Sequence, residues 1–267
     1  MFESTTANAL NRYRSSLTLV LCLIAGGLAF NSGTARAAGA DAYDAAVAQA
    51  GRSKADHDRD AIDHPAEVLR LTGIKPGMNV ADVLAADGYY SELLSYLVGP
   101  KGHVQLINNA AFEKWSEGAW AKRLQNGRLP NVEHRVAELE HMQLGDQTQD
   151  AVLLIKVYHD MWVKPDKTWP KVDVPVVLDE IARAIKPGGI LLLVDHSAAA
   201  GTGSADADRI HRIDEQFARH DIESHGFQMI ATTDVLRHPE DKRDLITYKG
   251  PMVGKTDRFV LVFKKNR

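Results

Sequence analysis

Short apolar runs alternate with segments of helical periodicity from Asn79 to the C-terminus. Turns rich in glycine and proline separate many of them, such as Lys75-Pro76-Gly77 and Gly99-Pro100-Lys101-Gly102. The pattern predicts strands over residues 79–84, 103–107, 132–136, 151–157, 190–194, 227–232 and 258–264. Strands that alternate with helices indicate a mostly parallel sheet covered by helices on both faces.

Three segments carry the apolar spacing of helices. The first has Tyr90, Leu93, Leu94 and Leu97 on one face, and the second has Leu178, Ile181, Ala182 and Ile185. Residues 206–225 predict a third, more polar helix with Ile210, Ile213 and Phe217 on one face, ending at Gly226. The segment 234–257, between the last two strands, is long, charged and predicted to be a loop.

The first 37 residues read as a secretory signal peptide. Arg12 and Arg14 precede an apolar stretch over 17–30, and Ala35-Arg36-Ala37 forms a cleavage site. A membrane-spanning helix needs about 20 apolar residues, and this stretch is shorter. We therefore expect cleavage after Ala37, a periplasmic or secreted product, a lead-in at 38–55 and one domain over 56–267.

Composition narrows the classes of function. Cys22 is the only cysteine and lies in the signal segment, so the mature chain has no disulfide and no thiolate nucleophile or ligand. Removal of residues 1–37 leaves 29 basic and 34 acidic residues, a net charge of −5. This balance argues against a nucleic-acid partner. We expect a small-molecule substrate and no stable membrane anchor after cleavage; the oligomeric state is left open.

Several local patterns resemble the class I methyltransferases that use S-adenosylmethionine (SAM). They are Gly73-Ile74-Lys75-Pro76-Gly77-Met78, the segment from Leu178 to Gly189 ending in Lys-Pro-Gly-Gly, and His225-Gly226-Phe227. More narrowly, Gly88-Tyr89-Tyr90-Ser91-Glu92-Leu93-Leu94, Val98-Gly99-Pro100-Lys101-Gly102 and Thr256-Asp257-Arg258-Phe259 resemble exported bacterial proteins described as predicted methyltransferases. The resemblance implies an α/β, Rossmann-like fold with a seven-stranded, mostly parallel sheet and one antiparallel C-terminal strand.

The resemblance places SAM at the loop after the first strand, where the family has an acidic residue followed by three alternating glycines. Asp82 and Gly88 match the first and last positions, whereas Leu84 and Ala86 replace two glycines. Glycine lets a backbone approach a ligand closely, so Leu84 is expected to add bulk where the cofactor would lie. The helix N-terminus after Gly88 still offers free N–H groups. A simple tight turn is the alternative.

Three further cofactor contacts are expected. Asn108 follows the second strand, where nucleotide-binding enzymes usually have an acidic residue that accepts hydrogen bonds from ribose. An amide accepts such a bond less strongly, and a polar turn is the alternative. The resemblance also implies contacts from Tyr89 and Tyr158, which follow the first and fourth strands.

Two histidine–aspartate pairs follow neighbouring strands. His159-Asp160 comes after the fourth strand and Asp195-His196 after the fifth. Because ligands bind beyond the carboxyl ends of parallel strands, His159, Asp160 and His196 are candidate catalytic residues, with His159 as a general base. Strand-capping polar residues are the alternative. A His/Asp pair can hold a divalent metal, but the chain has no HExxH motif, and we expect no metal.

Two surrounding segments are less specific. The stretch from Met161 to Pro170 has Trp162 and Trp169 between prolines, which fits a lid over the pocket or an ordinary packed loop. The mixed charges around Asp56 and Asp60 are typical of a solvated helix face, although the resemblance makes Arg59 a candidate at the pocket mouth.

Three functions are compatible with these features. The first is methyl transfer from SAM to a small molecule. The second is an exported enzyme that kept the fold, lost SAM and uses its histidines and aspartates for acid–base chemistry, since fold does not fix function. The third is a non-catalytic periplasmic ligand-binding protein.

We expect the full-length chain, expressed in a Gram-negative host, to be recovered from the periplasm with Ala38 as its first residue. Intact-mass spectrometry of the periplasmic fraction measures this. Ala37→Leu should block processing because small residues are required before the cut. An unprocessed, cytoplasmic wild-type chain would contradict the prediction.

Overall fold

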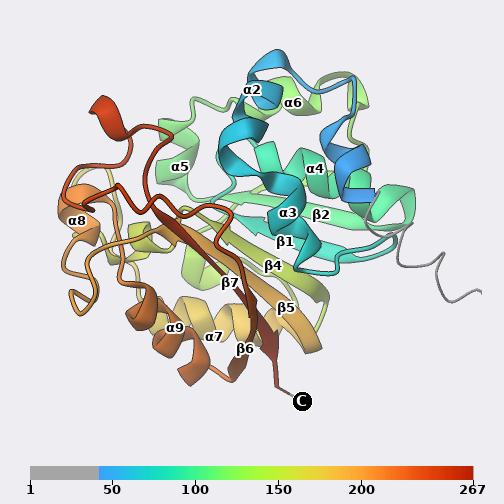
Figure 1. Cartoon of the computed structure of the whole chain (residues 1–267). Helices are drawn as coiled ribbons and strands as arrows, with labels where there is room; N and C mark the ends of the chain where they lie inside the picture. The colour runs from blue at the N-terminus through green and yellow to red at the C-terminus, as the bar shows by residue number, and fades with distance from the viewer. Residues whose placement is uncertain (1–41, 267) are drawn as a thin grey trace, which may run out of the picture.

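The computed structural model describes residues 42–266, so the predicted signal peptide lies outside the described residues. Seven strands form one sheet in the order β3-β2-β1-β4-β5-β7-β6, in which β7 alone runs antiparallel to its neighbours (Figure 1). The strands are β1 (Asn79–Val83), β2 (His103–Asn108), β3 (Val132–Val136), β4 (Gln149–Ile155), β5 (Ile185–His196), β6 (Phe227–Thr232) and β7 (Arg258–Lys265). The α/β fold expected from the sequence is confirmed.

Helices cover both faces of the sheet, with α7 and α9 on one face and α3 and α4 on the other (Figure 1). The α-helices are α2 (Lys54–Asp63), α3 (Pro65–Arg70), α4 (Tyr89–Val98), α5 (Ala110–Trp115), α6 (Trp120–Leu124), α7 (Val174–Ala184), α8 (Ala207–Ile210) and α9 (Glu215–Ser224), after a helical stretch over 42–47. Short 3-10 helices are η1 (Gly99–Lys101), η2 (Gln125–Gly127), η3 (Leu139–His141), η4 (His159–Trp162) and η5 (Gly250–Met252).

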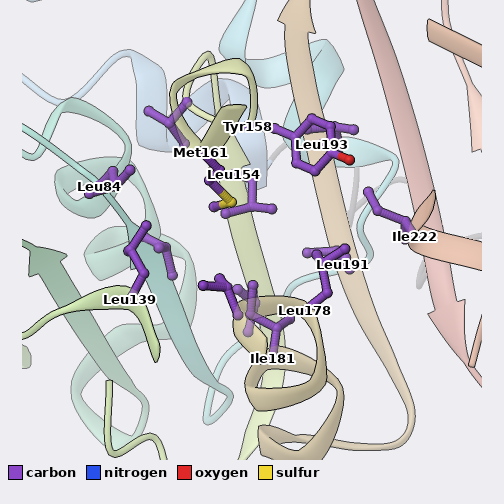
Figure 2. Close-up of a cluster of buried hydrophobic side chains, with 14 of the residues drawn as sticks. Leu84, Leu139, Leu154, Tyr158, Met161, Leu178, Ile181, Leu191, Leu193 and Ile222 are labelled. Atoms are coloured by element: carbon purple, nitrogen blue, oxygen red, sulfur yellow. The ribbon is translucent and has the colours of Figure 1, made fainter. Parts of the chain in front are cut away.

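Two hydrophobic clusters hold these layers together. Side chains of a strand point alternately to opposite faces, so Val152 and Leu154 of β4 join one cluster while Ala151 and Leu153 join the other. Figure 2 shows part of the first cluster, where Leu154 of β4 lies beside Met161 and Leu191 of β5 lies near Leu178 of α7. Burial on both faces explains why β4 is apolar at nearly every position.

The helix predicted over 206–225 is wrong, because the chain breaks between α8 and α9. His211 adopts a left-handed conformation with φ of 55° and ends α8. Asp214 then accepts hydrogen bonds from the backbone N–H groups of Gln216 and Phe217 and starts α9. Between them Arg212 is fully buried and pairs with Asp241 at 2.8 Å. The buried ion pair and the new N-cap therefore divide this segment into two helices, although its apolar residues recur at the spacing of one helix.

The solvated face predicted for the charges near Asp56 holds for Asp58, which is exposed, but is wrong for the charges on the opposite side of the helix. Arg52 and Asp56 are both buried. Arg52 pairs with Asp60 at 2.6 Å, and Asp56 pairs with Arg123 of α6 at 2.9 Å. The charges on α2 thus tie this helix to the domain, because each buried charge has a partner of opposite sign.

We predict that Arg212→Met destabilises the protein by about 3–5 kcal/mol, because it leaves the buried Asp241 carboxylate without its cation. Arg209→Met is the matched control: Arg209 is 62% exposed in its pair with Asp206, and loss of such a pair costs about 0–1 kcal/mol. Urea unfolding measures both. Equal losses of unfolding free energy in the two variants would show that the pair of Arg212 with Asp241 does not stabilise the break between α8 and α9.

Candidate functional site

A cavity of about 1200 Å³ opens at the carboxyl ends of β1, β4 and β5. This is the edge at which open α/β sheets bind ligands. One end of the cavity is bordered by Asp82, Leu84 and Ala86 of the loop after β1, and the other by His159 and His196. The structure therefore brings the first loop, His159, Asp160 and His196 to one cavity, as the sequence predicted, with Asp195 buried behind the lining.

The loop after β1 has the left-handed backbone that glycine adopts most easily, although only one of its left-handed residues is a glycine. Leu84 and Ala86 both have φ of 53°, and Gly88 has φ of 79°. Left-handed conformations cost roughly 1–2 kcal/mol for residues with a Cβ atom. Gly88 is also required by space, because a Cβ there would lie 2.6 Å from Cδ1 of Leu106. The tight path of the loop is thus preserved at an energetic cost.

The expected bulk of Leu84 is directed largely into the protein. Its side chain is only 2% exposed and belongs to the first hydrophobic cluster, where Figure 2 shows it near Leu139. Leu84 still forms part of the cavity wall. The substitution of leucine for glycine therefore adds a packed apolar wall and leaves the cavity open.

Asn108 has a different role from the one expected. Its Oδ1 accepts a hydrogen bond from the N–H of Ala86 at 2.8 Å, and its Nδ2 donates to the carbonyl of Ala86 at 3.0 Å. Nδ2 also donates to Glu113 at 2.9 Å. Asn108 is fully buried and is not among the residues that line the cavity. Its amide holds the strained loop in place, so it does not offer an acceptor to a ribose.

Asp82 lines the cavity but is almost fully buried. Burial raises the pKa of its carboxyl group to about 7, although Ser91 donates a hydrogen bond to it at 2.7 Å. Tyr89 also lines the cavity and donates a hydrogen bond to Asp60 at 2.5 Å, with the guanidinium of Arg59 3.9 Å from its ring centre. Arg59 lies at the cavity, as the resemblance implied.

Gly88 and Tyr158 are not among the residues that line the cavity. Tyr158 is fully buried, and its hydroxyl donates to Asp221 of α9, within the helical layer. This contact directs the phenol away from the expected cofactor side. Gly88 acts as the N-cap residue of α4, which is consistent with a backbone role.

His159 is held in a network of carboxylates. Asp195 accepts a hydrogen bond from its ring Nδ1 at 2.6 Å and from its backbone N–H at 2.8 Å. Its Nε2 lies 3.3 Å from Asp160, whose Oδ1 is also 3.2 Å from Nδ1 of His211. The rings of His159 and His196 are 5.9 Å apart. The structure thus joins both predicted pairs into one cluster.

The pKa values of His159 and His196 are shifted in opposite directions. Burial disfavours the charged form of His159, but Asp160 and Asp195 outweigh burial and raise its pKa to about 10. Burial and the nearby charge of His159 lower the pKa of His196 well below its usual value. His159 therefore carries a proton at neutral pH and is poorly suited to be the expected general base, whereas His196 is neutral.

Sequence reasoning missed three other groups at the cavity. His211 was placed on a continuous helix, and Thr256, which contacts Nδ1 of His196 at 2.8 Å, was placed in a loop. Lys156 lies at the end of the apolar run of β4 and pairs with Asp63 at 2.9 Å. A lysine at the end of such an apolar run indicates a charged partner nearby, because lysines are rarely buried unless they are paired. His211 gave no comparable signal.

Arg59, Lys156 and Arg258 surround the single carboxylate of Asp63. Arg59 contacts it at 2.7 Å, and Arg258 also donates a hydrogen bond to it. Burial opposes ionisation of Asp63, but the three cations hold its pKa well below the usual range. Burial lowers the pKa of Lys156 to about 8, with Asp63 acting in the opposite direction. All four residues line the cavity, which gives this wall a surplus of positive charge.

Trp162, at the end of η4, and Trp169, in the loop after it, have different surroundings. Trp169 lines the cavity and packs against Phe112 with ring centres 5.6 Å apart. Trp162 packs against Phe217 of α9, with ring centres 4.9 Å apart. One tryptophan thus supplies an aromatic cavity wall, and the other fixes the loop to the protein body.

Comparison with known proteins shows that this chain is similar to methyltransferases. Residues 82–193, from β1 into β5, match the family described as a methyltransferase domain. A ubiquinone/menaquinone biosynthesis C-methyltransferase from Teredinibacter turnerae is 26% identical over 131 residues, which are 48% of this chain and 47% of that protein. Its counterpart from Pseudomonas savastanoi is 29% identical over 48% of this chain and 46% of its own length. The chain thus spans about half the length of these relatives.

Solved structures share the fold over a longer stretch. A SAM-dependent methyltransferase from Aquifex aeolicus superposes with a TM-score of 0.56 at 23% identity, covering 78% of this chain and 93% of that one. The [4+2]-cyclase SpnF superposes with a TM-score of 0.54 at 16% identity, covering 82% and 86%. Residues 82–193 therefore match the methyltransferase-domain family, and the chain shares its α/β fold with solved methyltransferase structures.

Proposed function

We propose that this protein transfers a methyl group from SAM to a small molecule that binds beside His196. The observation that carries the proposal is the cavity: the glycine-like loop after β1 borders one end, and His196 borders the other. Its volume of about 1200 Å³ exceeds the roughly 300–1000 Å³ of most small-ligand pockets. A cofactor and an acceptor would fit together.

The residues present suit SAM at the first loop. The left-handed backbone at positions 84, 86 and 88 follows the tight turn that the family makes with glycines, and α4 begins directly after it. The wall of Arg59, Lys156 and Arg258 carries more positive charge than Asp63 neutralises. This surplus would attract the carboxylate of SAM or of an acidic acceptor. SAM, when bound, supplies an electrophilic methyl group.

The chain's own residues would orient the acceptor and remove its proton. Proximity and orientation supply much of the catalysis of a bimolecular transfer. Nδ1 of His196 is engaged by Thr256, and its Nε2 has no hydrogen-bond partner among residues 42–266. Nε2 of His196 would accept the proton of an acceptor O–H or N–H group as the methyl group is transferred. The products are S-adenosylhomocysteine and the methylated acceptor.

Export is part of the proposal. The sequence features of residues 1–37 support a periplasmic or secreted location. No helix within residues 42–266 has the length and apolar character needed to cross a bilayer. An exported methyltransferase would meet SAM outside the cytoplasm, so direct binding is the first property to measure.

We expect the chain 38–267 to bind SAM and S-adenosylhomocysteine with micromolar affinity in calorimetric titrations. Ala85→Phe fills the cavity beside the first loop and should weaken both affinities at least about tenfold, which corresponds to 1.4 kcal/mol. Ala205→Phe, at an exposed position that does not line the cavity, is the control. Absence of binding at millimolar ligand would reject methyl transfer and favour acid–base chemistry or ligand binding without SAM.

Once screening with labelled SAM identifies an acceptor, His196→Gln should lower kcat about 10²- to 10⁴-fold, the usual contribution of a general base, with SAM affinity unchanged. His225→Gln removes another histidine that contacts an aspartate, Asp179 at 2.7 Å, but does not line the cavity. It should keep wild-type kcat. Equal activity of His196→Gln and wild type would show that proton removal does not depend on His196.

A further inference from the structure

Three potential metal ligands converge at the histidine end of the cavity. His159 and Asp160 come from η4, directly after β4, and His211 comes from the break between α8 and α9. One ligand atom of each residue lies within 4.8 Å of the others. All three residues line the cavity. Segments about 50 residues apart in the sequence thus meet at one point.

Two of the three spacings among these atoms match those around a tetrahedral ion. Ligands at 2.0–2.1 Å from a tetrahedral Zn²⁺ lie about 3.3 Å from one another. Oδ1 of Asp160 lies 3.3 Å from Nε2 of His159 and 3.2 Å from Nδ1 of His211. A bound ion would also bring Nε2 of His159 and Nδ1 of His211 to this spacing, and these two nitrogens lie within 4.8 Å of each other.

The contacts of Asp195 are a second, independent indication of a metal site. Its carboxylate is fully buried, and it accepts hydrogen bonds from both Nδ1 and the backbone N–H of His159. The ring is thereby fixed with Nε2 directed to Asp160. Metal-bound histidines almost always donate their second nitrogen to a carboxylate, a carbonyl or water in this way. A carboxylate so placed orients His159 for coordination through Nε2.

His211 is also held in position. Its left-handed backbone follows α8, and the ring of Tyr248 packs edge-on against its imidazole with centres 4.8 Å apart. The buried pair of Arg212 with Asp241 anchors the next residue. The break in the predicted helix therefore places an imidazole at the cavity that a continuous helix would not.

We propose that His159, Asp160 and His211 form a site for a divalent transition-metal ion such as Zn²⁺, with its fourth position open to the cavity. Two imidazoles and one carboxylate favour zinc or iron over Mg²⁺ or Ca²⁺, which prefer oxygen ligands. Three protein ligands with one open position are typical of catalytic zinc sites. The open position would take an oxygen or nitrogen atom of a small molecule. The site departs from the expectation of no metal, and it does not require SAM.

The test uses the chain 38–267, stripped of metal with a chelator and titrated with Zn²⁺ in the absence of SAM. We expect one ion per chain with micromolar or tighter affinity in calorimetry. Co²⁺ should give the visible absorption of a tetrahedral complex. His211→Ala and Asp160→Asn should each weaken Zn²⁺ binding more than tenfold, and Asp195→Asn should weaken it about 10–100-fold through the orientation of His159.

His225→Ala is the matched control, because it removes another histidine that contacts an aspartate, away from the cavity. It should bind Zn²⁺ as wild type does. Circular dichroism of each metal-free variant checks folding, and X-ray absorption of the zinc-loaded wild type reports imidazole ligands without any substitution. No binding to wild type, affinity unchanged by His211→Ala, or a spectrum without imidazole would each overturn the proposal. Because SAM is absent, failure of this test leaves methyl transfer to be judged by its own titration.

Discussion

The candidate site depends on the buried carboxylate of Asp195 at the end of β5. It accepts hydrogen bonds from the ring and backbone of His159 and from the backbone N–H of His196. These bonds connect the ends of two neighbouring strands, β4 and β5. A buried carboxylate is tolerated only when such partners satisfy it, so the positions of both histidines are specified together. The chemistry at this end of the cavity follows from that constraint.

Two groups of charged residues adjoin each other at the cavity. Three cations surround Asp63. Asp160 and Asp195 hold a positive charge on His159, while burial and the charges of His159, Lys156 and Arg258 keep His196 neutral. Arg258 is the register partner of His196 across β5 and β7, so the cationic group lies beside the histidines. A metal ion bound to His159, Asp160 and His211 would replace the proton that now satisfies the carboxylates.

The loop after β1 shows how a sequence can lose a motif and keep its geometry. Leu84 and Ala86 adopt the left-handed conformation that glycines would adopt without strain. Two hydrogen bonds between the side-chain amide of Asn108 and the backbone of Ala86, one accepted and one donated by the amide, offset the cost together with burial of the Leu84 side chain. The conformation of this loop therefore depends on tertiary contacts, because only Gly88 of its left-handed residues is a glycine.

The sequence by itself determined the seven strands and the helices α4 and α7, and with them the edge of the sheet where His159 and His196 would meet. Those features follow from local periodicity and from the rule that parallel strands end at one edge. Tertiary structure alone decided the break at His211, the inward role of Asn108 and the proton on His159. Each of these depends on a partner distant in sequence: Asp241 for Arg212, Ala86 for Asn108 and Asp195 for His159. Periodicity reports which face of an element is buried, but the free energy of a buried charge depends on which opposite charge the fold brings to it.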